Sequence, residues 1–274
     1  MMGHKKTVLL LGSIFGAYMA IAFVNPWEGK ITLAELVLQL SGSRGEFSLG
    51  CSLPELMEYV LRMIPCYVAV MVLGKSLYSH FCTASIYVFS RCTNRLKWYG
   101  QAALSLFGDV CLFEILFTGT VILVTMVRYK IVFAFGGFLL LGYHSLIYVM
   151  WIFTWVLLMN LCAIKVGSSA SFMIIMGIQA VCTVGLSAVH EMEVALVPES
   201  AIEKFLLFNP VAHTILGWHG GTFVEAELAG SRYSMSLWAS AAVLFLFCTV
   251  ALMAGGVLVQ RHELLIEDIE LGAA

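Results

Sequence analysis

Residues 102–127 read AALSLFGDVCLFEILFTGTVILVTMV, and this run decides the fold class. It contains two charged side chains, Asp109 and Glu114, in a stretch longer than the roughly 20 apolar residues with which a helix crosses a bilayer. In lipid a backbone must pair its own N–H and C=O groups, and the run lacks the alternation of a barrel strand. We therefore predict a transmembrane helix here.

Five further apolar runs accompany this one. The chain is 61% hydrophobic and 12% charged over its 274 residues, whereas a soluble domain carries about 25% charged residues. The predicted spans are, in chain order, Val8–Val24, Tyr59–Leu77, Ala102–Val127, Phe138–Ile164, Ser171–Val189 and Leu237–Val259. The sequence thus predicts an all-α, polytopic integral membrane protein with about six transmembrane helices in a single domain, 1–274.

The same composition excludes several classes of function. A motor, kinase or nucleic-acid reader needs a polar segment of about 100 residues, and the sequence has none. The net charge of -2 gives no basic character that would favour nucleic acid as a partner. Eight scattered cysteines show neither metal-ligand nor disulfide spacing. Any energy source therefore has to come from another chain or from an ion gradient.

Lysine and arginine predict the orientation of the chain. With the N-terminus inside, the cytoplasmic segments hold eight of them: Lys5, Lys6, Lys75, Arg91, Arg95, Lys97, Lys165 and Arg261. The outer segments hold six: Lys30, Arg44, Arg128, Lys130, Lys204 and Arg232. The positive-inside rule therefore favours cytoplasmic N- and C-termini, a cytoplasmic loop at 78–101 and long outer loops at 25–58 and 190–236.

The outer loops contain signals for short helices. Residues 31–40 place Thr32, Glu35 and Gln39 on one helical face and apolar residues elsewhere, which predicts a helix along the outer membrane surface. Ser52 and Glu55 form a capping pattern before the second span.

Two further loop segments have their own signals. Ser200 and Glu203 repeat the capping pattern before a short helix that Asn209-Pro210 would end. Residues 128–137 are consistent with either a tight outer turn or a re-entrant piece.

Ionisable side chains inside predicted spans are candidates for function, because the hydrocarbon core penalises an unpaired charge. Arg62 follows Glu58 by four residues, so an ion pair with a snorkelling arginine accounts for it. Asp109 and Glu114 have two interpretations: hydrogen bonding between helices, or a role in conformational coupling or the translocation path.

The loop at 78–101 contains the segment SIYVFSRCTNRLKWYGQ at residues 85–101. A helix here would place Arg91 and Arg95 on one face, with Trp98 near them at the membrane boundary and Lys97 alongside. One interpretation is a positive-inside anchor. The other is a coupling element that docks into a cytoplasmic partner.

The pattern Tyr-Val-Phe-Ser-Arg-x-x-x-Arg-x-Lys-Trp-Tyr resembles the loop after the second span in ABC-transporter permeases of the type-2 exporter class, and is similar to that of lantibiotic and peptide-antibiotic immunity permeases. The six spans and the Phe208-Asn209-Pro210 turn agree with this resemblance. It implies that Arg91, Arg95, Lys97 and Trp98 contact an ATP-binding subunit in which ATP and Mg are held.

The resemblance also implies a second permease chain, alike or related, in a bacterial cell membrane. This chain itself would bind no cofactor and have no catalytic residue, and its cargo would be hydrophobic or amphipathic, such as a peptide antibiotic or a lipid-like molecule.

Two other classes of function remain open. Ser187 and His190 near the end of the fifth span faintly resemble an intramembrane serine protease, but a helix terminus and a boundary residue account for them better. His213 and His219 share an outer loop without further ligands, so no metal site is expected. The acidic outer loops would also suit a noncatalytic membrane sensor or scaffold.

Overall fold

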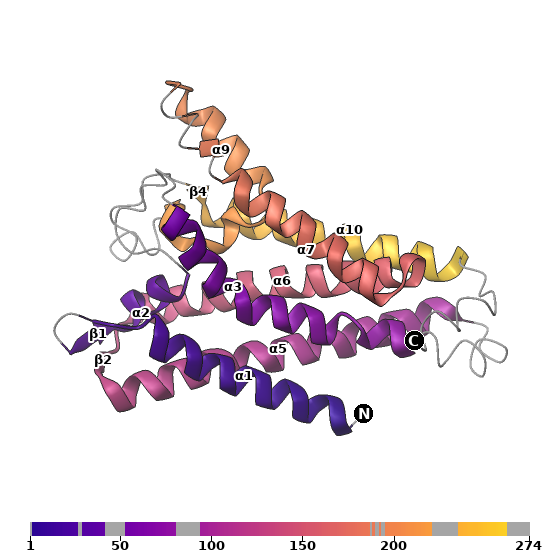
Figure 1. Ribbon diagram of the computed structural model, residues 1–274, viewed down its shortest axis with the longest axis horizontal. Helices are drawn as coiled ribbons and strands as arrows, with labels where there is room; N and C mark the ends of the chain where they lie inside the picture. The colour runs from indigo at the N-terminus through magenta and orange to yellow at the C-terminus, as the bar shows by residue number, and fades with distance from the viewer. Residues whose placement is uncertain are drawn as a thin grey trace.

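The long helices run side by side, roughly along the longest axis of the molecule (Figure 1). The computed structural model describes residues 2–26, 29–41, 53–80, 94–186, 188–189, 192, 195–220 and 235–261. The long helices are α1 (Met2–Ala22), α3 (Leu53–Leu73), α5 (Arg95–Arg128), α6 (Phe135–Val166), α7 (Ser168–Gly185) and α10 (Leu237–Arg261). All six, α3 together with the residues up to His80, are long and apolar enough to cross a membrane. The six predicted spans are confirmed as helices, and the chain has the character of a multi-pass membrane protein.

Short elements connect the long helices. These are α2 (Leu33–Leu40), α9 (Glu199–Phe208), the 3-10 turns η1 (Ala212–Thr214) and η2 (Leu216–Trp218), and the strands β1 (Lys30–Thr32), β2 (Lys130–Val132), β3 (His219–Gly220) and β4 (Met235–Ser236). Helix α9 projects away from the bundle (Figure 1).

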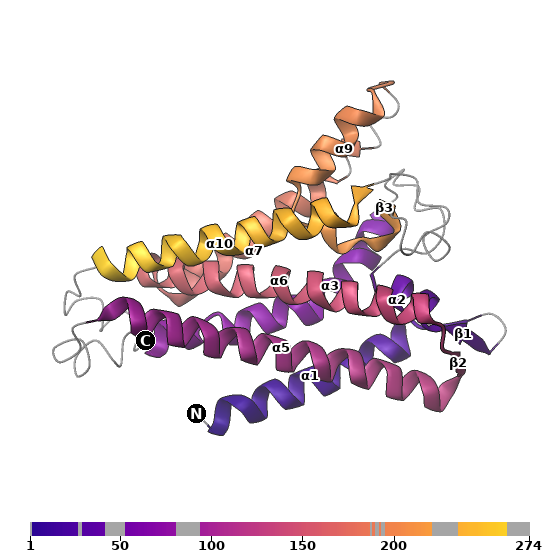
Figure 2. The ribbon, with the colours of Figure 1, turned by 180° about the vertical axis from the view of Figure 1, so that it is seen from behind.

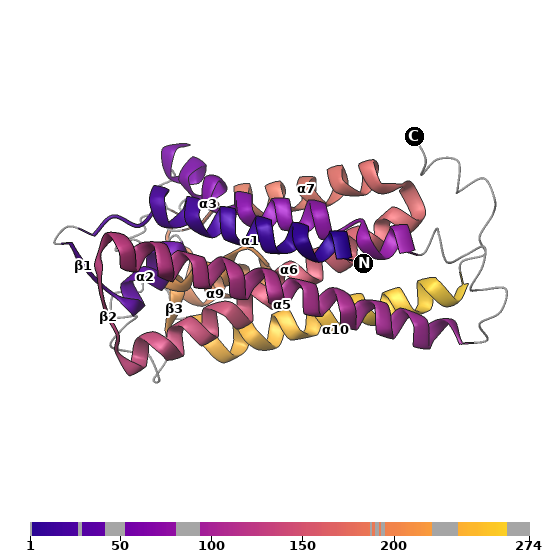
Figure 3. The same cartoon turned by 90° about the horizontal axis from the view of Figure 1, so that it is seen from below.

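The bundle has two distinct ends. The first turns of α1 and α5, residues 76–80 and the last turn of α10 lie together at one end, which we call the Lys5 end (Figure 3). The last turn of α5, the strands β1 and β2, and the first turns of α6 and α10 lie at the other, which we call the Arg128 end (Figures 1 and 3). The first helix therefore begins and the last helix ends at the same end of the bundle.

Helix α6 is the central helix of the bundle (Figure 2). Every residue from Trp151 to Leu157 is buried, and α6 contacts α2, α3, α5, α7 and α10. A helix that is apolar all round its circumference has no preferred outward face, so it occupies the interior. All six long helices, α6 included, leave some large apolar side chains exposed, among them Leu104, Val127, Val181 and Trp238. In a bilayer those side chains would contact lipid.

Helices α1 and α5 pack closely through two glycines. A Cβ atom on Gly12 would lie 2.9 Å from the Leu116 Cβ, and one on Gly16 would lie 2.5 Å from the Phe117 carbonyl oxygen. The Gly-x-x-x-Gly spacing places both residues on one face of α1, where the missing side chains let the backbones approach. This contact holds the first span against the one that begins at Arg95.

The second span is interrupted near the Lys5 end. Helix α3 ends at Leu73, Gly74 and Lys75 form a turn, and residues 76–80 are helical again. Asn160 of α6 is fully buried against this turn; its Oδ1 accepts from the Tyr78 N–H at 3.0 Å and its Nδ2 donates to the Leu73 carbonyl at 3.2 Å. One side chain thus provides partners for backbone groups on both sides of the turn, as irregular backbone within a membrane requires.

The link between α5 and α6 forms a strand. Strand β2 pairs in parallel with β1, and the Lys130 N–H donates to the Gly29 carbonyl at 3.1 Å. Arg128 Nη1 donates to the Ala20 carbonyl at 2.8 Å, so a cation contacts the last turn of α1, where the helix dipole favours it. The segment predicted as a turn or a re-entrant piece is therefore a short strand that ties two helix connections together.

Helix α2 has a complete capping box, in which the Glu35 N–H donates to Thr32 Oγ1 at 3.1 Å and the Thr32 N–H donates to the Glu35 carboxylate at 2.9 Å. Its apolar residues Leu33, Ala34, Leu36, Val37 and Leu40 are buried within the protein, and α2 contacts α6. The predicted helix is present, but its apolar side packs on the bundle.

Of the two other predicted helix starts, one agrees with the structure and one does not. Helix α3 begins at Leu53, as the capping pattern predicts, although Ser52 itself lies outside the described residues. Helix α9 begins at Glu199 with Pro198 as its N-cap, so the predicted cap at Ser200 is wrong. Pro198 has a φ of -55°, close to the helical value, which lets the helix start earlier. Its end at Phe208 agrees with the prediction.

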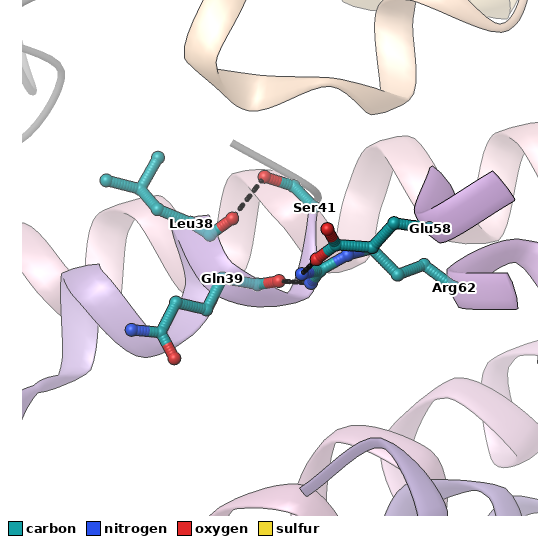
Figure 4. A network of polar contacts seen from close by, with 5 residues as sticks. All are labelled: Leu38, Gln39, Ser41, Glu58 and Arg62. Carbon is teal, nitrogen blue, oxygen red and sulfur yellow. Dashed lines mark hydrogen bonds and ion pairs between the residues drawn. The ribbon is translucent and has the colours of Figure 1, made fainter. Parts of the chain in front are cut away.

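Arg62 is buried, with 4% of its surface exposed, and links α3 to α2 (Figure 4). Its guanidinium donates to the Glu58 carboxylate at 2.5 Å and to the Gln39 carbonyl, and lies 4.4 Å from the centre of the Phe23 ring. The predicted Glu58–Arg62 pair is confirmed, but the arginine does not snorkel away from the protein. It joins the end of α2 to the first turns of α3 instead.

Candidate functional site

A polar cavity of about 380 Å³ lies at the Lys5 end of the bundle. Three elements supply its walls: the start of α1, the helical turn at 76–80 and the first four turns of α5. The lining residues are Lys5, Ser76, Leu77, Ser79, His80, Trp98, Gln101, Ala102, Ser105, Leu106 and Asp109. Seven of these eleven side chains are polar or charged.

The α5 wall of the cavity follows from helical geometry. Trp98, Gln101, Ser105 and Asp109 recur at spacings of three and four residues, so they form one stripe along the helix. The helix begins at Arg95 because Asn94 caps it, its Oδ1 accepting from the Lys97 N–H at 3.0 Å. This start fixes which side of α5 carries the stripe.

The cavity combines charges of both signs. Lys5 from α1 and His80 after the break in α3 line it together with the Asp109 carboxyl group. The Ser79 hydroxyl donates to the Ser76 carbonyl at 2.9 Å, which holds the short turn at 76–80 in shape. The cavity can therefore offer hydrogen bonds and balanced charge to a polar group. The described residues contain no cluster of three or more histidine, cysteine, aspartate or glutamate side chains that could hold a metal ion.

Glu114 does not line this cavity. It is 1% exposed on the side of α5 that faces the bundle interior, and the Thr118 hydroxyl donates to its Oε1 at 2.8 Å. Ser145 of α6 lies close enough to act as a second hydroxyl partner. The Thr118 bond lies within α5 itself, so both interpretations from the sequence, interhelix hydrogen bonding and a role in conformational coupling or the translocation path, stay predictions.

The structure brings some predicted site residues together and separates others. Trp98 and Asp109 share the cavity, whereas Lys97 is exposed and Arg95 half-buried on the same first turns of α5. Arg91, Ser187 and His190 lie outside the described residues. Within the predicted loop at 78–101, residues 78–80 and 95–101 are helical, and residues 81–93 lie outside the described residues.

Sequence reasoning missed Lys5, His80 and Gln101 as members of one site. Lys5 and His80 come from elements far apart in the sequence, and only the fold places them beside α5. A usable signal did exist in the polar stripe from Trp98 to Asp109, because three polar side chains at helical spacing are unusual in an apolar run.

Known proteins give no further guide to this site. Comparison of the chain with protein-family models, with curated proteins and with solved structures found no match. The argument for function therefore depends on the fold and the cavity.

Proposed function

We propose that this chain is the membrane-spanning permease subunit of an ATP-driven exporter of the ABC type, with its Lys5 end in the cytosol of a bacterial cell. A separate ATP-binding subunit would hold ATP and Mg, and a second permease chain, identical or related, would complete the translocation unit within the membrane lipid. The cargo would be a hydrophobic or amphipathic molecule such as a peptide antibiotic.

The observation that carries the proposal is the length and continuity of α5. The helix has 34 residues, which corresponds to about 50 Å, whereas the hydrocarbon core is about 30 Å thick. It therefore extends beyond the membrane while remaining one rigid element. Its first turn carries Arg95, Lys97 and Trp98, cationic and aromatic side chains suited to contact with another protein.

A movement of the first turn of α5 would be transmitted to the rest of the bundle through the contacts of this helix. Helix α5 contacts α1, α3, α6 and α10, and its closest packing is with α1 at Gly12 and Gly16. Trp98 also shares the cavity with Lys5 and with the broken end of α3, so three helices meet where a partner would bind. In this proposal Asp109 responds to the rearrangement of the cavity, and Glu114 keeps α5 attached to α6.

The proposed class of cargo has support from a second cavity. A space of about 300 Å³ between α6 and α10 is lined almost wholly by apolar side chains, including Trp151, Trp155, Leu244 and Phe247. An apolar space of this kind accommodates hydrocarbon and not a sugar or an ion.

Reversing the charge of Arg95 and Lys97 together is expected to abolish binding of the ATP-binding subunit. The tagged chain, purified in mild detergent from its native membrane, should carry an ATP-binding-cassette protein, and the Arg95→Glu/Lys97→Glu variant should recover at least about tenfold less of it. Tenfold corresponds to about 1.4 kcal/mol, less than the 2–5 kcal/mol typical of truncating a buried charge pair.

Two matched variants control for nonspecific effects of charge. Lys165→Glu changes an exposed lysine on α6 at the Lys5 end, and Lys130→Glu changes an exposed lysine at the Arg128 end. Both should retain the ATPase. Equal loss in all variants, or no ATP-binding-cassette protein with the unmodified chain, would contradict the proposal, and a catalytic or sensor function would then have to be considered.

A further inference from the structure

Two histidines at the Arg128 end converge on one serine. His213 of η1, His219 after η2 and Ser240 near the start of α10 are all fully buried. Ser240 Oγ lies 2.9 Å from His213 Nδ1 and 2.9 Å from His219 Nε2. The serine hydroxyl is therefore within hydrogen-bond distance of two imidazole rings from a different part of the chain.

The other nitrogen of each ring fixes the position of its hydrogen. His213 Nε2 lies 3.0 Å from the Leu207 carbonyl oxygen, and His219 Nδ1 lies 3.0 Å from the Ile215 carbonyl oxygen. A carbonyl oxygen only accepts, so a neutral ring must place its single hydrogen on that nitrogen. The two nitrogens that face Ser240 are then both acceptors.

The neutral cluster has no hydrogen atom for one of the two contacts between Ser240 and the histidines. Ser240 Oγ carries one hydrogen and can donate it to one imidazole nitrogen only. In the neutral cluster the other 2.9 Å contact places a nitrogen lone pair against an oxygen lone pair. One added proton removes this conflict, because a protonated histidine donates to Oγ while Oγ donates to the other histidine.

We propose that His213, Ser240 and His219 form a site that binds a single proton and makes the Arg128 end of the bundle sensitive to acid. The proton enters the lone pair of one ring, no covalent bond breaks, and the cluster gains one positive charge. A second proton would set two cations against the same hydroxyl, so the folded protein takes up only one. This inference does not depend on the proposed transport function.

The surroundings of the cluster set the pH at which this happens. Tyr143 of α6 faces it, with its ring centre 6.0 Å from that of His219 and its hydroxyl donating to the Leu237 carbonyl at 3.0 Å. Tyr143 also packs against a cluster of buried apolar residues from α2, α6, η2 and α10: Ala34, Val37, Leu140, Leu216 and Leu237. The neighbouring His213 acts electrostatically on His219, and the Tyr143 hydroxyl also lies within hydrogen-bond reach of Ser240.

Burial lowers the pKa of His213 to about 4 and that of His219 to about 4, the latter also because of the neighbouring His213. Both values lie below the ordinary value of 6.5. The unfolded chain therefore binds protons more tightly than the folded one. The contribution of this cluster to stability is complete above pH 6.5 and is lost as the pH falls toward 4.

Hydrogen exchange tests this pH dependence. Backbone amides of residues 212–219 in the full-length protein should open increasingly often as the pH falls from 6.5 to 4, after correction for the intrinsic exchange rate. Amides in the middle of α6 serve as the internal reference and should not change. Opening that is independent of pH, or that decreases on acidification, would overturn the inference.

Proton uptake can be counted directly. Full-length protein labelled with ¹⁵N-histidine, in lipid nanodiscs, would be titrated by NMR from pH 7.5 to 2, with the His213→Gln and His219→Gln variants assigning the two rings. We expect one imidazolium per chain from this pair while the protein remains folded. Two imidazolium rings in the folded protein, none, or two independent titrations near pH 6.5 would overturn the inference.

Variants at position 240 test whether the Ser240 hydroxyl is required for proton binding. Ser240→Ala should lower the midpoint of proton uptake by at least about one pH unit, a tenfold loss of proton affinity. Ser240→Thr retains a hydroxyl and should keep the original midpoint, as should Ser236→Ala on the exposed strand β4. An unchanged midpoint in Ser240→Ala would contradict the shared site. If that variant does not fold, the number of protons taken up by the unmodified protein still tests the inference.

Discussion

Replacing Asn160 with leucine is expected to destabilise the bundle by on the order of 2–4 kcal/mol. The substitution removes the acceptor of the Tyr78 N–H and the donor to the Leu73 carbonyl, at a fully buried position. A buried polar group that loses its partner costs about 1–3 kcal/mol. Unfolding by SDS in mixed micelles, followed by the loss of helical circular dichroism, measures the difference.

Thr154→Val provides a control on the same helix. The Thr154 hydroxyl is buried and donates to the Met150 carbonyl one turn earlier, at 2.8 Å, within α6 itself, and the Cys248 thiol of α10 lies within hydrogen-bond reach of it. Such a bond adds little to the helix, so this variant should change stability by less than about 1 kcal/mol. If Asn160→Leu were no more disruptive than Thr154→Val, the break in α3 would not depend on Asn160.

Adding a methyl group at Gly16 is expected to separate α1 from α5. The new Cβ atom would lie 2.5 Å from the Phe117 carbonyl oxygen and 2.8 Å from the Thr120 Cβ, and backbone atoms cannot move aside as a flexible side chain can. Overpacking of this kind costs about 1–3 kcal/mol. The same SDS unfolding measurement should place Gly16→Ala at the upper part of that range.

Gly119→Ala is the matched variant, because Gly119 is also helical but a Cβ atom there would have no neighbour within 4 Å. Alanine is favoured over glycine in a helix by about 1 kcal/mol, so this change should be neutral or stabilising. Equal destabilisation by both alanines would mean that the Gly12–Gly16 face is not the contact between the two helices.

The sequence predicted the long helices well because hydrophobic length is a local property. The six spans and the end of α9 at Phe208 follow from apolar runs and from the Asn209-Pro210 pair, which act over a few residues. The start of α9 was misplaced because two competing caps, Pro198 and Ser200, stand two residues apart and local pattern does not rank them.

Features that depend on distant partners could not be predicted. The interruption after Leu73 is supported by Asn160, more than 80 residues later in the sequence, and an isolated apolar run gives no sign of it. The candidate cavity likewise requires Lys5 and Asp109 to meet across three elements.

The histidine cluster shows the same limit. Among the described residues, His213 and His219 belong to no group of three or more possible metal ligands, and their common partner is a serine at the start of α10. A search for metal-ligand residues at characteristic spacings in one loop does not find a hydroxyl group that another helix supplies.

The most direct test of the proposed function is which side of the membrane the two ends of α5 face. Single cysteines at Lys97 and Lys130 would be treated in intact cells with a membrane-impermeant maleimide, and labelling would be compared with that of the parent chain. We expect Lys130→Cys to react in intact cells and Lys97→Cys to react only after the membrane is permeabilised. Reaction of Lys97→Cys in intact cells would place the cationic start of α5 outside, where no ATP-binding subunit could reach it, and would contradict the account.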